Sequence, residues 1–345
     1  MLRTCSVFMA TLMLSGFAFA ANPGTATPPS AIETQSRALE RASNAVLGVQ
    51  ALALADARSN ATLGRLRQGS GVVIGADGLV LTIGYLILEA DQVQLVHGDD
   101  DRVVPARVVG YDLATGFGLL QALAPLRVAP VPLGGSRAVT PDEPLFIASG
   151  GENAAVSAAR LVSRRAFAGY WEYRIDDALF TAPPRRDHSG AGLFNSRGEL
   201  VGIGSLFVAD ALERSPAAGA RVPGNMFVPV DLLRPILGEL RTRGSTVASQ
   251  RAWLGINCVE QDGELRVARV NDDSPAEVAG LKVGDRIVRI DTVAVDTLDQ
   301  LWTRLWAGGA PEREVRLDIV RNGVAQTLRV QSVDRMKAIR RAAGI

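Results

Sequence analysis

The sequence predicts a mainly β fold, with two β-barrels followed by a small α+β unit. Three observations support this fold class. Short apolar segments recur roughly every 8–12 residues between positions 46 and 230, with turn-forming residues between them. One helical pattern follows at 231–241, where apolar residues lie three or four positions apart. Residues 252–332 then combine strand patterns with short helical patterns, which indicates a separate unit.

The first predicted barrel covers residues 45–135 and follows a weak helical pattern at 31–44. Its first strand is the apolar run 46–54, after which a polar, exposed loop is expected at 55–67. Segments 71–74 and 79–82 are expected to form a hairpin, because Asp77-Gly78 between them suits a tight turn. Further strands are predicted at 93–96, 103–109, 118–122 and 128–133.

The second predicted barrel covers residues 140–230. Its predicted strands are 144–148, 155–162, 171–175, 192–194, 200–207 and 226–230. The helix at 231–241 closes this region and is amphipathic. Its apolar face consists of Leu232, Leu233, Ile236, Leu237 and Leu240.

The C-terminal unit begins near Trp253 and contains a predicted strand at 264–270. Ser274 is followed by Pro275 and then Glu277, a pattern that predicts a capped helix start. A second helix carries one apolar stripe made of Leu298, Leu301, Trp302, Leu305 and Trp306. A last hairpin turns at Asn322-Gly323, and the basic residues after it are expected to form a solvated tail.

Composition and charge exclude several classes of function. The chain has 345 residues, of which 47% are hydrophobic, and a formal net charge of +1. No bulk charge is therefore available to recruit nucleic acid or an anionic membrane. Histidines, cysteines and carboxylates nowhere have metal-ligand spacing, and no phosphate-binding loop is present, so neither a metal nor a cofactor is expected.

Residues 1–20 have the pattern of a secretory signal. Arg3 precedes a short apolar stretch, and Ala18-Phe19-Ala20 fits a cleavage site. No other segment is apolar for long enough to span a membrane. We therefore expect an exported chain, in the bacterial periplasm. Cys5 leaves with the signal, and the remaining thiol, Cys258, is expected to be a buried strand residue.

The stretch around Ser189 is the candidate nucleophile turn. His188 precedes this serine and Gly190 follows it, directly before an apolar segment. A serine nucleophile needs its hydroxyl on a tight turn, with backbone N–H groups free to face an oxyanion. It also needs a base and an acid, so the rest of the chain decides whether the turn is active.

Several motifs, in the same order along the chain, resemble an HtrA/Deg-type serine protease. They include Gly69-Ser70-Gly71, Ala76-Asp77-Gly78, Ser189-Gly190 and the stretch 195–203. In the C-terminal unit, Leu254-Gly255-Ile256, Ser274-Pro275-Ala276 and Gly284-Asp285 resemble the PDZ domain of that family. The resemblance implies a chymotrypsin-like double β-barrel followed by one PDZ domain. The predicted parts are a signal at 1–20, a tether and helix at 21–44, a protease-like domain at 45–244, a linker at 245–251, a PDZ domain at 252–332 and a basic tail at 333–345.

The resemblance places the catalytic positions one by one. Tyr85 stands where the family has its catalytic histidine, and Gly116 stands where it has the aspartate. Asp112 matches a different, non-catalytic aspartate. Ser189 retains the nucleophile position, while Asp187 replaces a glycine whose N–H serves the oxyanion hole. Its carboxylate is expected to oppose the negative charge of the transition state.

These replacements predict a weak site. A serine hydroxyl is a poor nucleophile without a positioned base, and a tyrosine with a pKa of about 10 is a poor substitute for imidazole. His97 is expected in a surface turn, and His188 is expected to point away from its neighbour Ser189. Residues 21–281 contain no lysine, which excludes a Ser–Lys pair there. Ser189 is therefore interpreted as a vestigial nucleophile.

Two functions are carried forward. The first is a periplasmic pseudoprotease that binds protein C-termini or extended peptides through its PDZ domain, in a scaffold or quality-control role. The resemblance implies that the loop Trp253-Leu254-Gly255-Ile256 holds the peptide carboxylate. It also implies that one groove wall is the helix that bears Leu298, Leu301, Trp302 and Leu305. The second is an active endopeptidase that uses Ser189 with a non-standard base. A homo-oligomer remains an alternative. The trimers of the family that this chain resembles are held partly by aromatic side chains near the mature N-terminus. Residues 21–84 contain no aromatic side chain, so such a trimer is not expected.

Overall fold

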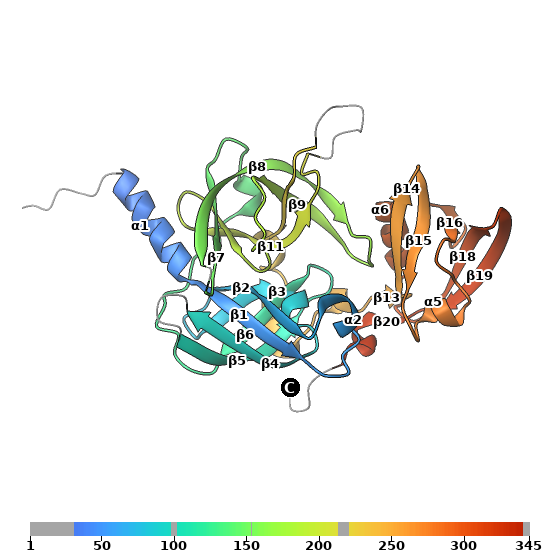
Figure 1. The fold of residues 1–345 in the computed structure, drawn as a ribbon, viewed down its shortest axis with the longest axis horizontal. Helices are drawn as coiled ribbons and strands as arrows, with labels where there is room; N and C mark the ends of the chain where they lie inside the picture. Colours follow the sequence, from blue (N-terminus) through green and yellow to red (C-terminus); the bar gives the residue numbers. More distant parts are fainter. Residues whose placement is uncertain (1–30, 98–101, 153, 213–220, 341–345) are drawn as a thin grey trace, which may run out of the picture.

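The computed structural model describes residues 31–97, 102–152, 154–212 and 221–340. It confirms the predicted fold class, with two closed six-stranded barrels followed by a smaller α+β unit. Figure 1 shows the barrels side by side and the C-terminal unit beside the end of one long hairpin. The predicted signal, the tether and the turn after His97 lie outside the described residues.

The first barrel follows helix α1 (Ala31–Asn44) and is closed in the order β1-β2-β3-β6-β5-β4. Its strands are β1 (Val46–Ala53), β2 (Leu66–Val73), β3 (Leu79–Ile83), β4 (Ala90–His97), β5 (Arg102–Tyr111) and β6 (Phe117–Ala122). The loop expected at 55–67 contains the short helix α2 (Asn60–Leu63), and α3 (Gly84–Ile87) follows β3. The Asp77-Gly78 hairpin is formed as predicted, with Val73 opposite Val80.

The strand predicted at 128–133 is wrong. This segment forms only one bridge, between Leu133 and Leu200. Pro130 and Pro132 remove two backbone donors, so a continuous ladder cannot form. The segment instead crosses from one barrel to the other, with Val131 N–H bonded to Val73 and the carbonyl of Pro132 bonded to Leu200.

The second barrel is closed in the order β10-β11-β12-β9-β8-β7. Its strands are β7 (Leu145–Ser149), β8 (Ala155–Ala168), β9 (Arg174–Ala182), β10 (Gly192–Phe194), β11 (Leu200–Val208) and β12 (Gly224–Pro229), and η1 (Ser136–Ala138) precedes them. The strand predicted at 171–175 is misplaced, since β9 begins at Arg174 and continues to Ala182. The paired Asp176 and Asp177 interrupt the apolar alternation there, which hid the strand.

The single helix predicted at 231–241 is also wrong. The chain forms a 3₁₀ turn, η3 (Val230–Leu232), and then a shorter helix, α4 (Leu237–Arg243). Pro235 lacks an N–H and disfavours helical geometry in the residue before it, so the regular helix starts only after it. Gly244 ends α4 in the left-handed region, with φ of 72°.

The C-terminal unit is built on a sheet in the order β14-β15-β16-β18-β19. Its strands are β13 (Ala252–Trp253), β14 (Ile256–Gln261), β15 (Glu264–Val270), β16 (Arg286–Ile290), β17 (Val293–Ala294), β18 (Glu314–Arg321), β19 (Val324–Gln331) and β20 (Val333–Asp334). Its helices are η4 (Val247–Ser249), α5 (Pro275–Val278), α6 (Leu298–Ala307) and η5 (Arg335–Ala338). The predicted cap of α5 is present, because Ser274 Oγ accepts from Glu277 N–H at 3.2 Å.

Three apolar cores hold these parts together. The largest one contains side chains from both barrels, including Leu81 of β3 and Met226 of β12. A smaller one lies within the second barrel, and the third lies inside the C-terminal unit. Cys258 belongs to this third core and is fully buried, as expected.

The expected solvated tail is wrong for residues 333–340. Strand β20 pairs with β13, so the chain returns to the start of the C-terminal unit. Arg335 N–H donates to the carbonyl of Arg251 at 3.0 Å, and Arg340 N–H donates to Glu89 of the first barrel at 3.0 Å. The described part of the tail is therefore a strap between the C-terminal unit and the first barrel.

Candidate functional site

The nucleophile turn lies between β9 and β10, where the two barrels meet. Ser189 is held there by its carbonyl, which accepts from Ser70 N–H at 2.8 Å. Gly190 has φ of 75°, and a Cβ on it would lie 1.9 Å from the carbonyl oxygen of Ser70. Only glycine fits so close an approach of two backbones. Packing of the barrels therefore requires this glycine, whether or not the serine reacts.

Tyr85 on α3 reaches the nucleophile. Its hydroxyl oxygen lies 2.8 Å from Ser189 Oγ and 2.7 Å from the carbonyl oxygen of Ser205. A carbonyl can only accept, so a phenol proton donated to Ser205 leaves the phenol oxygen to accept from the serine hydroxyl. Burial raises the pKa of Tyr85 to about 12. A neutral phenol oxygen is a much weaker base than an imidazole nitrogen.

Gly116 occupies a place where a side chain would have an unfavourable backbone conformation and one tight contact. Its φ is 87°, and a Cβ there would lie 3.1 Å from the hydroxyl oxygen of Tyr173. That hydroxyl donates to the carbonyl of Thr115 at 2.7 Å. The carbonyl of Gly116 in turn accepts from Gly84 N–H, at the start of the helix that carries Tyr85. Backbone contacts and a tyrosine thus fill the position.

Asp112 is close to Gly116 in sequence but has another task. One carboxylate oxygen accepts from the N–H of Thr115 at 2.8 Å and from its hydroxyl at 2.6 Å. The other accepts from the hydroxyls of Thr246 and Ser249, in the segment that leads to the C-terminal unit. Four donors saturate this buried carboxylate. Asp112 therefore joins the first barrel to the linker.

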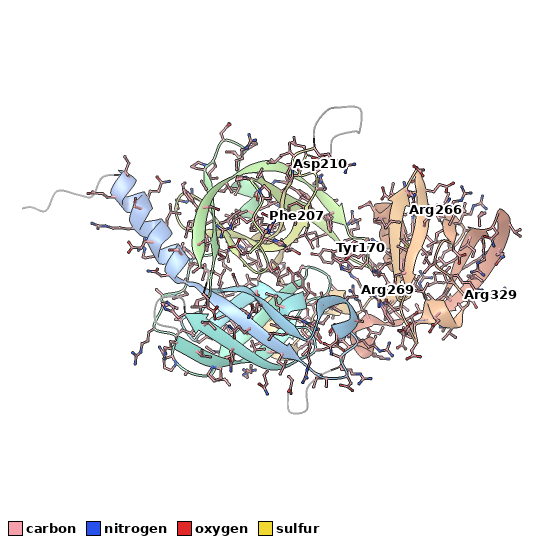
Figure 2. All side chains as sticks on the ribbon, in the orientation of Figure 1. Tyr170, Phe207, Asp210, Arg266, Arg269 and Arg329 are labelled. Atoms are coloured by element: carbon pink, nitrogen blue, oxygen red, sulfur yellow. The ribbon has the colours of Figure 1, made fainter. Side chains whose placement is uncertain are left out.

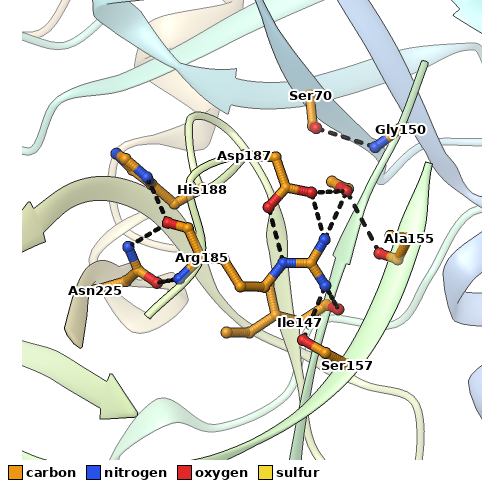
Figure 3. Close-up of polar contacts among 10 residues, drawn as sticks. Ser70, Ile147, Gly150, Ala155, Ser157, Arg185, Asp187, His188 and Asn225 are labelled. Carbon is orange, nitrogen blue, oxygen red and sulfur yellow. Dashed lines mark hydrogen bonds and ion pairs between the residues drawn. The ribbon is translucent and has the colours of Figure 1, made fainter. Parts of the chain in front are cut away.

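The carboxylate of Asp187 faces the guanidinium of Arg185 and forms an ion pair with it, as Figure 3 shows. Arg185 Nε donates to it at 2.8 Å, a second guanidinium nitrogen contacts it, and Ser149 Oγ donates to it. These contacts, above all the bond from Arg185, lower the pKa of Asp187 to about 2. The sequence reasoning missed Arg185 and Ser149, although an arginine two positions before an aspartate is a usable signal. The charge facing an oxyanion is consequently smaller than expected.

The two histidines do not supply a base in the described arrangement. His188 Nδ1 lies 3.0 Å from the carbonyl oxygen of Arg185 and donates to it (Figure 3). Burial lowers the pKa of His188, so its ring is neutral at pH 7. His97 was expected in a surface turn, but it is the last residue of β4 and pairs with Arg102 of β5. It lines a cavity of about 130 Å³ with Leu47 and Leu95 of the first barrel.

The predicted carboxylate-binding loop, Trp253–Ile256, already holds a carboxylate. It belongs to Glu172, which lies in the connection between β8 and β9. Glu172 Oε1 accepts from the N–H groups of Leu254 at 3.1 Å, Gly255 at 2.7 Å and Ile256 at 3.2 Å. Burial raises the pKa of Glu172 to about 7, against the lowering effect of nearby Arg335 and of these N–H bonds. Glu172 was not among the predicted site residues.

The predicted groove wall on α6 is divided between core and groove. Leu301, Trp302 and Leu305 are fully buried, and Leu298 packs against the same core. Trp302 also faces the second barrel, since its indole N–H donates to the carbonyl of Gly169 at 2.8 Å. Trp253 lies in β13 and pairs with Val333. The structure thus brings the loop and Trp302 together with the segment 169–172.

Comparison with known proteins agrees with this architecture. The trypsin-like peptidase domain family matches residues 69–203, and the PDZ domain family matches residues 252–331. This chain has the HtrA-type serine protease fold. Within the described residues, no group of three or more His, Cys, Asp or Glu is placed to hold a metal ion. No helix in the described part of the chain is long and apolar enough to cross a membrane.

Related HtrA-type chains are distant in sequence. A protein of Halomonas elongata named "Probable periplasmic serine endoprotease DegP-like" is 27% identical over 275 residues, which cover 74% of this chain and 54% of the relative. A protein of the same name from Pseudomonas putida (strain W619) is 28% identical, covering 76% and 55%. This chain therefore spans about half the length of the curated relatives it matches.

Solved structures support the HtrA-type fold over most of the chain. The structure titled "HtrA-type protease AlgW with tripeptide" has a TM-score of 0.51 at 22% identity and covers 89% of this chain and 98% of its own. A serine endoprotease from Yersinia pestis also gives a TM-score of 0.51 at 22% identity, covering 89% and 99%.

Proposed function

We propose that this chain is an exported, periplasmic pseudoprotease that binds peptides through its PDZ domain and acts as a scaffold or in protein quality control. The single observation that carries the proposal is the contact between Ser189 and Tyr85, 2.8 Å long, where a protease needs an imidazole. A phenol whose pKa lies near 12 does not deprotonate serine at neutral pH. The names of the relatives support periplasmic export.

In this proposal, both barrels act as a scaffold. Gly116, the acid position, is filled by backbone and by the Tyr173 hydroxyl. The catalytic replacements Tyr85, Gly116 and Asp187 thus form a packed, internally paired junction. The parts of the proposed protein are the protease-like domain at 45–244, the linker at 245–251 and the PDZ domain at 252–332.

Peptide binding is assigned to the PDZ groove. Its loop presents three converging N–H groups, from Leu254, Gly255 and Ile256, which suit a carboxylate. The neighbouring strand β14 offers the edge at which an extended peptide is added. The expected ligands are therefore protein C-termini.

Fluorophosphonate labelling tests the loss of catalysis. The purified chain and a trypsin-like protease are incubated with the same probe, and labelling is followed by intact mass. We expect labelling of Ser189 to be slower by a factor of about 10⁴ or more, since removal of a triad base or its orienting acid costs that much. Ser189→Ala and Ser196→Ala serve as site-specific and matched serine controls. Stoichiometric labelling that only Ser189→Ala removes refutes the proposal.

The second candidate is an active serine endopeptidase. It is favoured by the names of the relatives and by the retained Ser189 on its turn. Cleavage of a denatured casein substrate, abolished by Ser189→Ala and unaffected by Ser196→Ala, establishes this alternative.

A further inference from the structure

The peptide groove of the PDZ domain is filled by the chain itself. We propose that residues 169–172 are an internal ligand that mimics a C-terminal peptide, and that an external peptide with a free carboxylate binds only by displacing them. This inference rests on the proposed peptide-binding function. Three sets of contacts carry it, and each corresponds to one part of a PDZ–peptide complex.

The first set is in the loop. Glu172 is 2% exposed, and one of its carboxylate oxygens receives the N–H groups of three successive residues, Leu254 to Ile256. In a PDZ complex such a loop holds the terminal carboxylate of the peptide. The side-chain carboxylate of Glu172 has the same shape and, when ionised, the same charge. It therefore takes the place that a chain terminus would occupy.

The second set is along the strand. Trp171 forms an antiparallel bridge with Asn257, and Cys258 N–H donates to the carbonyl of Tyr170 at 2.7 Å. The segment thus runs antiparallel to β14, with Glu172 at the loop end. This is the polarity of an added peptide strand whose last residue lies at the loop.

The third set is on the helix side. Trp302 on α6 donates its indole N–H to the carbonyl of Gly169 at 2.8 Å. Ala168 packs against the apolar core of the PDZ domain. The segment is consequently held between β14 and α6, which are the two walls of the groove. Figure 2 places Tyr170 at the end of the β8–β9 connection, facing the PDZ domain.

The barrel side fixes the segment in this conformation. Trp171 and Tyr173 stack, with ring centroids 5.5 Å apart and an interplanar angle of 8°, and Phe167 contacts both rings. Side chains alternate along an extended segment, so Trp171 and Tyr173 lie on the barrel side while Glu172 faces the loop. The carbonyl of Glu172 also accepts from the guanidinium of Arg335 in the tail. The internal ligand is therefore presented by a rigid scaffold, which reduces the entropy lost on docking.

The test compares peptide binding and amide exchange in the full chain. The probe is a fluorescent peptide with the sequence of residues 163–172 and a free C-terminal carboxylate. A second peptide, amidated and ending in Gln, carries no carboxylate at that end. Glu172→Gln removes the charge but keeps the size of the side chain. Asp262→Asn is the matched control, because Asp262 is an exposed carboxylate in the turn between β14 and β15.

At pH 8, where the Glu172 carboxylate is largely ionised, we expect Glu172→Gln to bind the probe at least about tenfold more tightly than the wild type, because an ionised carboxylate accepts stronger bonds from the three N–H groups than a neutral amide oxygen does. Amide exchange of residues 254–258 is expected to accelerate by a similar factor. Asp262→Asn should change neither quantity, and the peptide without a carboxylate should bind weakly to every variant.

The outcomes separate the two proposals. Tight and equal binding to wild type and Glu172→Gln, with equal exchange at 254–258, overturns the internal ligand but leaves the peptide-binding function standing. Faster exchange in Glu172→Gln without peptide binding to any variant supports the internal ligand and overturns the peptide-binding function.

Discussion

Opening of the PDZ groove should depend on pH, because Glu172 is buried in the closed form. Burial raises its pKa to about 7, against an ordinary value of 4.5 when the segment is released. A raised pKa means that the closed form binds a proton more tightly than the open form. This contribution to closure is complete below pH 4.5 and is lost as the pH rises through about 7.

The size of the effect follows from the two pKa values. At pH 6 most closed molecules carry the proton, and opening releases it, whereas at pH 8 few do. Linkage then makes the closing equilibrium about tenfold more favourable at pH 6 than at pH 8. The groups that face Glu172 do not titrate in this range. Burial raises the pKa of Cys258 and of Tyr173, and the guanidinium of Arg335 stays charged although burial lowers its pKa.

Fluorescence anisotropy with the probe of residues 163–172 measures this dependence. The quantity of interest is the ratio of the Kd of the wild type to the Kd of Glu172→Gln, because the carboxyl groups of the probe affect both in the same way. We expect this ratio to be about tenfold larger at pH 6 than at pH 8, at constant ionic strength. A ratio that is independent of pH, or larger at pH 8, refutes the reasoning.

Three further substitutions test the junction between the barrels and the linker, with unfolding followed by circular dichroism. Tyr85→Phe leaves the buried carbonyl of Ser205 without its donor, so it should lower the free energy of unfolding by about 1–3 kcal/mol without changing fluorophosphonate labelling. Gly190→Ala should cost more than about 3 kcal/mol, because its Cβ would lie 1.9 Å from the carbonyl of Ser70; an unchanged Tm contradicts this. Asp112→Asn cannot accept all four donors and should cost about 2–4 kcal/mol, whereas the exposed Asp262→Asn should be neutral.

The sequence patterns predicted the fold well wherever one segment carried its own signal. The Asp77-Gly78 turn, the cap at Ser274 and strand β15 are local features, and each was formed as expected. The errors arise where local pattern and backbone chemistry disagree. Pro235 delays a helix whose apolar spacing is sound, and prolines at 130 and 132 prevent a strand in an apolar run.

The contacts of the candidate site can also be divided into local ones and long-range ones. The contact between Tyr85 and Ser189 spans 104 positions and could be anticipated only because the motifs around both residues resemble a known family. The pairing of Asp187 with Arg185 is local, but the Asp187 carboxylate also accepts a hydrogen bond from Ser149, which is 38 positions away. Glu172 and Gly255 are separated by 83 positions, and no spacing rule connects an acidic residue in one domain to a loop in another. Such contacts are decided by tertiary packing.

Two successive residues connect the loop of the PDZ domain to the surroundings of Gly116. Glu172 fills the carboxylate loop of the PDZ domain, while the hydroxyl of Tyr173 donates to Thr115 beside Gly116. A Cβ at position 116 would lie 3.1 Å from this hydroxyl, a tight contact. Because Glu172 and Tyr173 are adjacent in the chain, one short segment contacts both the loop of the PDZ domain and the first barrel.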